Sequence, residues 1–252
     1  MCLILFAYKV HPTYKLIVGA NRDEFYNRAT APAHFWEDIS TILAGRDLEK
    51  HGTWMGVTKT GRFSALTNYR DPSEDLKEKR SRGELVANAL TYKGDIQLYI
   101  ESLSRSKKKY PGYNLLAGDQ NELYYYSNVS NEFKKLQPGI YGVSNHLLNT
   151  GWPKVQKGKE GLAHCLKLDR DQLVGNIFHI LQNSDPFPDE QLPNTGVPLE
   201  WERLLSSLFI RSKDYGTRSS TVLLMSNQQI QYVERVFSKG EFFNEQSYSI
   251  EL

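Results

Sequence analysis

Short apolar runs separated by turn residues occupy much of the first 70 positions. Residues 2–10 and 14–20 are mostly aliphatic, β-branched or aromatic and flank a turn at His11-Pro12, which predicts two antiparallel strands. Residues 54–59 and 62–67 flank a Thr-Gly turn in the same way, so we expect a second hairpin there. The chain therefore begins as an antiparallel structure.

Helical spacing replaces this pattern further along the chain, where apolar side chains recur every three or four positions. The spacing predicts helices over residues 83–92, 95–106, 153–167 and 171–182, with a short helix over 199–208. Strand-like runs lie between and after them, at residues 113–117, 122–127, 132–136, 140–144, 219–226 and 229–237.

The order of strands, helices, strands, helices and strands predicts an α+β protein. Most strands join their sequence neighbours as hairpins, which argues against a doubly wound parallel sheet. Residues 183–198 contain four prolines and one glycine, so we expect a surface loop there. The segment after this loop holds too few elements for a domain of its own, and we expect residues 1–252 to form a single domain.

The first hairpin brings a polar segment close to the N-terminus. If the turn centres near residue 12, the numbers of paired residues sum to about 23–25, and Cys2 lies across from Asn21, Arg22 or Asp23. Along a strand, Asn21 and Asp23 point to one face, whereas Arg22 and Glu24 point to the other. A shift of one residue in register exchanges these faces, so the sequence leaves open which pair faces Cys2.

Cys2 directly follows the initiator Met1. If Met1 is removed, Cys2 carries both a thiol and a free α-amine, whose ordinary pKa values are about 8.5 and about 8. The amine can then act as the general base of a thiol nucleophile, and Asp23 is the first candidate to orient that amine. A cysteine in an apolar strand is also commonly a buried structural thiol, and this alternative stays open.

Three further polar clusters lie at the ends of predicted strands: Asn68 with Arg70, Asn145 with His146, and Arg218. Asparagine side chains can donate hydrogen bonds to the oxyanion of a tetrahedral intermediate. Turn or capping chemistry accounts for each cluster equally well when it is taken alone. We expect the clusters to lie along one rim of a sheet, although the sequence does not prove that they converge.

Charge and composition narrow the classes of function. The 31 Lys and Arg residues nearly balance the 29 Asp and Glu residues, for a net charge of +2, which gives no electrostatic case for nucleic acid. Two cysteines suit a reducing compartment, and no stretch approaches the roughly 20 apolar residues of a membrane span, so we expect a cytoplasmic protein. The partner expected is a small-molecule ligand or substrate, with no metal and no required cofactor, because neither a phosphate-binding glycine loop nor a metal-ligand spacing of histidines is present.

The polar segment after the first hairpin resembles a known family. Asn21-Arg22-Asp23-Glu24 is similar to the motif that gives its name to the NRDE family, also called the transport-and-Golgi-organisation family. The resemblance continues in order through Gly52-Thr53-Trp54, Thr67-Asn68-Tyr69-Arg70, Ser81-Arg82-Gly83-Glu84, Tyr141-Gly142-Val143-Ser144-Asn145, Trp152-Pro153-Lys154 and Thr217-Arg218-Ser219-Ser220-Thr221. It covers nearly the whole chain and implies the N-terminal-nucleophile (Ntn) hydrolase fold, a four-layer αββα sandwich of two antiparallel sheets flanked by helices.

A weaker resemblance extends to the choloylglycine and penicillin-V acylases, which begin with Met-Cys, lose the methionine and cleave amide bonds. It implies Cys2 as the nucleophile and Asp23 as the contact of the α-amine. It further implies that Asn68 and Asn145 lie near the oxyanion and that Arg218 supports the nucleophile. The substrate contacts that we expect beside these are Asn21, Arg22, Trp54, Arg70 and His146.

Two functions from different classes follow. The first is hydrolysis of an amide or ester bond in a small, largely apolar acyl substrate by Cys2, once Met1 is removed. The second is non-catalytic binding and trafficking of haem, or of a lipid or acyl-CoA, on the same fold, which the family resemblance suggests. His146 is the axial-ligand candidate for haem, since the chain lacks the Cys-x-x-Cys-His signature of covalent attachment.

Overall fold

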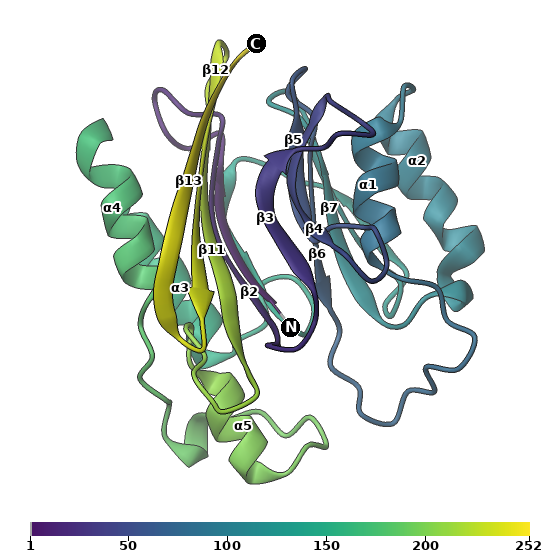
Figure 1. The fold of residues 1–252 in the computed structure, drawn as a ribbon, viewed down its shortest axis with the longest axis vertical. Coiled ribbons are helices and arrows are strands. Elements are labelled where there is room, and N and C mark those ends of the chain that lie inside the picture. The colour runs from purple at the N-terminus through teal and green to yellow at the C-terminus, as the bar shows by residue number, and fades with distance from the viewer. Residues whose placement is uncertain (1) are drawn as a thin grey trace.

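Two antiparallel sheets lie face to face, and helices cover the outer face of each (Figure 1). The computed structural model describes residues 2–252. The first sheet contains, in spatial order, β10 (Gly139–Val143), β1 (Cys2–Tyr8), β2 (Leu16–Phe25), β11 (Tyr215–Met225), β12 (Gln229–Ser238) and β13 (Glu241–Glu251). The second contains β3 (Thr30–Phe35), β4 (Ile42–Asp47), β5 (Met55–Thr58), β6 (Phe63–Asn68), β7 (Tyr113–Gly118), β8 (Leu123–Ser127) and β9 (Glu132–Lys135).

The helices divide between the two outer faces. α3 (Pro153–Cys165) and α4 (Arg170–Leu181) pack on the first sheet, whereas α1 (Gly83–Thr91) and α2 (Ile96–Ser102) pack on the second. α2 continues into a 3-10 helix, η1 (Leu103–Lys109). A second short turn, η2 (Asp189–Gln191), and α5 (Leu199–Ser206) follow α4, with α5 at the bottom of Figure 1. The expected αββα arrangement is therefore confirmed.

The core forms on both faces of the first sheet, and this explains the continuous apolar run at the start of the chain. Side chains alternate between the two faces of a strand. In β1, Ile4 and Phe6 pack between the two sheets, whereas Leu3 and Leu5 pack under the helices. A strand that is covered on both faces needs apolar residues at every position, and that is the pattern of residues 3–8.

The expected elements are largely present, with two kinds of difference. β2 extends to Phe25, so the Asn21–Glu24 segment lies within the strand and not beyond its end, because β11 pairs with it through Thr217↔Asp23 and Ser220↔Asn21. Three strands that the sequence patterns do not predict, β3, β4 and β13, lie at or next to the edges of the sheets.

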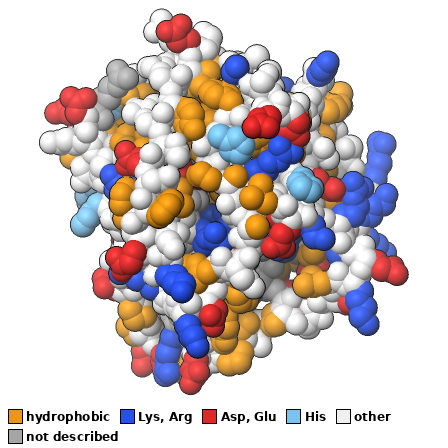
Figure 2. Space-filling model, viewed as in Figure 1, with side chains coloured by type: hydrophobic (Ala, Val, Ile, Leu, Met, Phe, Trp, Pro, Cys, Tyr) orange, Lys and Arg blue, Asp and Glu red, His pale blue; other side chains and the backbone are white. Residues whose placement is uncertain are grey.

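The surface mixes charges over the face shown in Figure 2, where acidic and basic side chains are interspersed among hydrophobic ones. Within residues 2–252, no helix is both long enough and apolar enough to cross a membrane.

Candidate active site

The register of the first hairpin decides which side chains accompany Cys2. Cys2 pairs with Arg22, so the numbers of paired residues sum to 24, within the range that the turn predicts. Directly opposed residues of an antiparallel pair share a face, and Cys2 and Arg22 therefore lie on the same side of the sheet. The carbonyl oxygen of Cys2 accepts a hydrogen bond from Ser144 Oγ at 3.0 Å, which fixes the start of β1. The thiol is free and half-buried.

A cavity of about 520 Å³ opens beside Cys2. Its size lies within the roughly 300–1,000 Å³ of small-molecule sites. The cavity brings together five of the residues that the sequence singles out: Cys2, Arg22, Asp23, Trp54 and Asn68.

Charged side chains make up ten of the 18 residues that line this cavity. The basic ones are Arg22, Arg28, Lys50, Lys79, Arg80 and Arg82, and the acidic ones are Asp23, Glu24, Asp47 and Glu84. This lining differs from what the expected substrate, a small and largely apolar acyl compound, would favour. The reason is that the loops at this end of the sheets contribute charged residues, while the large apolar side chains pack into the cores.

Arg22 forms one wall of the cavity. Its guanidinium carbon lies 4.2 Å from the centroid of the Trp54 ring, a cation–π contact. Its Nη2 lies 3.9 Å from Glu24 Oε2, and its buried Nη1 has no hydrogen-bond partner among the residues that the structure describes. Arg22 therefore keeps hydrogen-bonding capacity at the wall next to Cys2.

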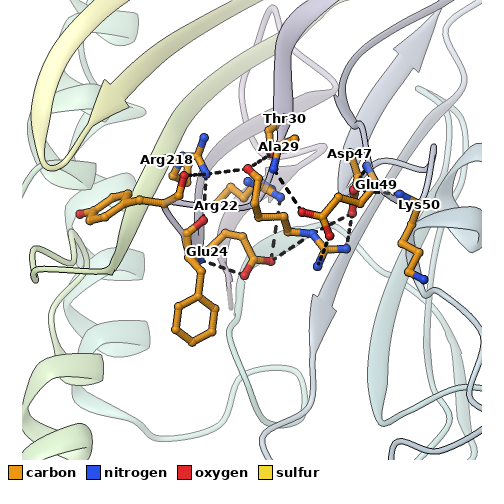
Figure 3. A network of polar contacts seen from close by, with 11 residues as sticks. Arg22, Glu24, Ala29, Thr30, Asp47, Glu49, Lys50 and Arg218 are labelled. Atoms are coloured by element: carbon orange, nitrogen blue, oxygen red, sulfur yellow. Dashed lines mark hydrogen bonds and ion pairs between the residues drawn. The ribbon is translucent and has the colours of Figure 1, made fainter.

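A polar network ties the end of β2 to β4, as Figure 3 shows. Arg28 donates from Nε and Nη2 to the Asp47 carboxylate at 3.0 and 2.7 Å, and its Nε also lies 3.9 Å from Glu24 Oε2. Asp47 in turn accepts from the backbone N–H groups of Glu49 and Lys50. The network joins the two sheets at the cavity rim and holds Glu24 beside Arg22.

Asp23 lies on the helix-facing side of β2, yet it reaches the same cavity. Its Oδ1 accepts a hydrogen bond from Thr217 Oγ1 at 2.7 Å. Burial raises the pKa of this carboxyl, and the charge of Lys154, the bond from Thr217 and the charge of Arg22 act in the opposite direction. Burial likewise raises the pKa of the Cys2 thiol, while Arg22 and a hydrogen bond from the Asp23 backbone lower it.

The two asparagines expected near the oxyanion are in contact with each other. Asn145 is fully buried, and its Nδ2 donates to the backbone carbonyl of Asn68 at 3.0 Å. The backbone carbonyl of Asn145 accepts from the N–H of Arg70, so Asn145 also fixes the chain after β6. Only Asn68 of the two lines the cavity, where its side-chain amide makes no hydrogen bond to any residue within 2–252.

Besides Asn145, four of the expected site residues lie outside the cavity lining and have structural contacts. Asn21 Nδ2 donates to the carbonyls of Leu181 and Leu208, both at 2.8 Å. Arg218 Nη1 donates to the backbone carbonyls at residues 25, 26 and 28.

Arg70 and His146 have comparable structural contacts. Arg70 forms a 2.7 Å ion pair with Glu202. The His146 ring bonds through Nδ1 to Thr150 Oγ1 at 2.9 Å and packs against the rings of Tyr69 and Trp152.

Three residues outside the expected set also belong to the site. Arg82 lines the cavity, donates to the carbonyl of Gly112 at 2.9 Å and interacts electrostatically with Cys2. The buried Tyr215 and Lys154 both interact electrostatically with Asp23 and Cys2. Arg82 and Lys154 belong to the family motifs at residues 81–84 and 152–154. The sequence therefore marked both residues, but it did not show that they lie near Cys2.

Comparisons with known proteins agree with this architecture. The family model described as Transport and Golgi organisation 2 matches residues 1–239. The Transport and Golgi organization protein 2 homolog of Bos taurus is 36% identical over 260 residues, which covers 93% of this chain and 92% of that protein. Transport and Golgi organization protein 2 of Drosophila melanogaster is 30% identical over 268 residues, covering 94% and 93%.

A solved structure supports the fold independently. The N-acylethanolamine-hydrolyzing acid amidase ortholog of Caenorhabditis elegans matches with a TM-score of 0.52 and 13% identity, covering 88% of this chain and 92% of that one. At this identity the likeness shows the Ntn-hydrolase-like fold alone. Because the family model spans nearly all of the sequence, the chain belongs to the Transport and Golgi organisation 2 family.

Proposed function

We propose that this protein is an N-terminal cysteine hydrolase that cleaves an amide or ester bond of a small acyl compound after Met1 is removed. One observation carries the proposal: Cys2, Asp23 and Asn68 line a single cavity. They supply a thiol nucleophile, a carboxylate for the α-amine and an amide donor for an oxyanion. The Ntn-hydrolase-like fold supports the same proposal.

The reaction would proceed in two balanced steps. The α-amine of Cys2 takes the thiol proton, and Sγ attacks the acyl carbonyl while the Asn68 amide donates to the developing oxyanion. When the bond to the leaving group breaks, the ammonium returns the proton to that group and a thioester remains on Cys2. Water then attacks the thioester with the amine as base, the C–S bond breaks, and the acid and the free thiol are released.

The cavity lining changes the substrate class that we expect. Trp54 and Leu66 offer apolar surface for an acyl group, but charged residues form most of the remaining wall. Arg22 keeps an unpaired Nη1 among the described residues, and an anionic or strongly polar group of the substrate would satisfy it. We therefore propose an acyl compound with a polar or anionic group near the scissile bond, in place of a largely apolar one.

The sharpest test uses one chain in two states. The protein is expressed with a leader that a protease can remove so that the new N-terminus is Cys2, and a panel of amide and ester substrates is assayed before and after cleavage. We expect hydrolysis only after cleavage, because the leader keeps the nitrogen of Cys2 in a peptide bond. Intact mass confirms the terminus in each sample.

Two variants make this test specific. Cys2→Ala with the same leader should stay inactive after cleavage, whereas Cys165→Ala should behave as the wild type because Cys165 is buried under the helices. Equal hydrolysis before and after cleavage, or hydrolysis by cleaved Cys2→Ala, would rule out the proposed mechanism.

A second candidate is non-catalytic binding of a lipid, an acyl-CoA or haem, with no cofactor required. The observation in its favour is that burial raises the pKa of the Cys2 thiol, which disfavours the reactive thiolate. Mixing leader-cleaved wild type with an acyl-CoA separates the two functions, because a carrier binds the compound without hydrolysing it; haemin is titrated in parallel, and Cys2→Ala should bind either ligand as the wild type does if the protein is a carrier. For haem, an unchanged Soret band in His146→Ala would exclude His146 as the ligand.

A further inference from the structure

A buried lysine lies at the start of α3, outside the reaction steps described so far. Lys154 is the second residue of this helix, and only 3% of its surface is exposed. Its Nζ donates one hydrogen bond, of 2.9 Å, to the carbonyl oxygen of Leu205 in the last turn of α5. α3 itself packs on β1 and β10, so this lysine lies under the strand that begins with Cys2.

Folding stability does not explain this choice of residue. An ammonium loses its hydration on burial, and one carbonyl contact does not offset that loss. The first turn of a helix is also the positive end of its dipole, which disfavours a cation. Burial lowers the pKa of Lys154 to about 8, and the charge of Arg70 acts in the same direction. A residue that breaks local rules in this way usually serves a site.

The buried charges around Lys154 balance one another. Arg70 and Glu202 are 6% and 4% exposed and form a 2.7 Å ion pair, so each has its counterion. Asp23 is 2% exposed, and among the groups that oppose the effect of burial on it are Lys154 and Arg22. Arg22 lies on the other face of β2, whereas Lys154 belongs to a helix that packs on the same side of the sheet as Asp23.

We propose that Lys154 is a positioning residue whose ammonium keeps the buried Asp23 carboxylate ionised, so that Asp23 can hold the α-amine of Cys2. The inference rests on the proposed hydrolase function. During that reaction the α-amine alternates between its neutral and protonated forms. At neutral pH, below the Lys154 pKa of about 8, an ammonium on the helix side would keep Asp23 charged in both, so that the amine keeps its orientation while it acts as a base.

The test measures the ionisation of Asp23 directly. Carbon-13 NMR of aspartate-labelled, leader-cleaved protein, with Asp23→Asn to assign the signal, gives the carboxyl pKa in wild type, Lys154→Met and Lys154→Arg. We expect the pKa of Asp23 to rise by about one unit or more in Lys154→Met, a tenfold change in ionisation, and to stay near the wild-type value in Lys154→Arg. Lys157→Met is the matched control, because Lys157 lies on the same helix with its side chain 46% exposed.

The pH profile of hydrolysis provides the second reading. The acidic limb should move to higher pH in Lys154→Met and not in Lys154→Arg or Lys157→Met. Cys2, Tyr215, Arg70 and Glu202 also interact with Asp23 or Lys154, and they are the same in all these variants. If no hydrolysis is found but the pKa of Asp23 moves, the proposed function fails and the Lys154–Asp23 link stands. If hydrolysis is found and that pKa does not move, the inference is overturned.

A double variant keeps the inference testable if Lys154→Met does not fold. Lys154→Met/Asp23→Asn removes both charges, so it should unfold at a higher urea concentration than Lys154→Met alone. A lysine that only packs against Leu205 would give additive losses instead, and that result would also overturn the inference.

Discussion

The two faces of β2 at its polar end are built for different tasks. On the helix-facing side, Asn21 donates to two backbone carbonyls and accepts from Ser220 Oγ at 2.6 Å, so every polar atom of its side chain is used inside the protein. On the side facing the other sheet, Arg22 stacks on Trp54 and leaves Nη1 without a partner among the described residues. Adjacent residues of one motif therefore divide between holding the fold and offering a site.

The largest effect on stability should come from the helix-facing side. Asn21→Ala leaves the carbonyls of Leu181 and Leu208 and the hydroxyl of Ser220 buried without their present partner. We expect the free energy of unfolding to fall by about 3 kcal/mol, since each unsatisfied buried group costs about 1–3 kcal/mol and partial relaxation recovers some of it. Urea denaturation measures the change, and a loss below about 1 kcal/mol would contradict the structural role of Asn21.

Arg22→Met should change the reactivity of the Cys2 thiol strongly and the stability of the fold only slightly. Arg22 lowers the pKa of the Cys2 thiol, so its removal raises that pKa and reduces the thiolate fraction at neutral pH. We expect alkylation of Cys2 by iodoacetamide at pH 7 to slow by about threefold to tenfold, which corresponds to roughly half a pKa unit to one unit. Stability should change by only about 1 kcal/mol, the size of the contact with Trp54. Alkylation at an unchanged rate would show that Arg22 does not act on the thiol.

The contact between Arg22 and Trp54 should contribute less to the free energy of unfolding than the hydrogen bonds of Asn21 do. In a double-mutant cycle of Arg22→Met and Trp54→Leu, we expect an interaction free energy of about 1 kcal/mol, the size of a partly desolvated cation–π pair. Urea unfolding of the four proteins supplies this value. Strict additivity would mean that the two side chains lie together without stabilising each other.

The smallest effect concerns a buried carboxylate on the same inter-sheet side as Arg22. Glu234 Oε1 accepts from the N–H of Ala33 at 2.6 Å, and burial raises the pKa of Glu234. Between the ordinary pKa of about 4.3 and the raised folded value, the unfolded state loses its proton first, so the wild type loses stability as pH rises. Glu234→Gln lacks this titration and should gain stability relative to the wild type from pH 4 to pH 7. A pH-independent difference would show that the pKa of Glu234 is not raised in the folded protein.

Elements with strong local patterns could be predicted from the sequence, and elements that depend on distant partners could not. The hairpin of β1 and β2 was predictable, and its register to within one residue, because a turn at His11-Pro12 limits which residues pair; the structure settles that Arg22 lies opposite Cys2. β3 contains Pro32 and is only partly buried, and β13 is mostly exposed, so neither shows an alternation of apolar and polar residues. Their partners in the sheets define them.

The same limit applies to the candidate site. The sequence placed the Asn21–Glu24 segment beside Cys2 through local geometry. It could not place Arg82 or Lys154, because loops and helix packing bring them from 80 and 152 positions away. The resemblance to the acylases implied that Arg218 supports the nucleophile, and the described hydrogen bonds of that guanidinium are with the backbone carbonyls at residues 25, 26 and 28.

The most direct test of the account is a mass measurement of a trapped acyl-enzyme. Leader-cleaved protein is mixed with an activated acyl ester, quenched in acid within seconds and analysed as intact protein and as peptides. The account predicts a mass increase of one acyl group on the N-terminal peptide at Cys2, absent from the uncleaved protein and from Cys2→Ala. An unmodified N-terminal peptide across the ester panel, or an equal adduct on the uncleaved chain, would contradict the claim that Cys2 is an N-terminal nucleophile.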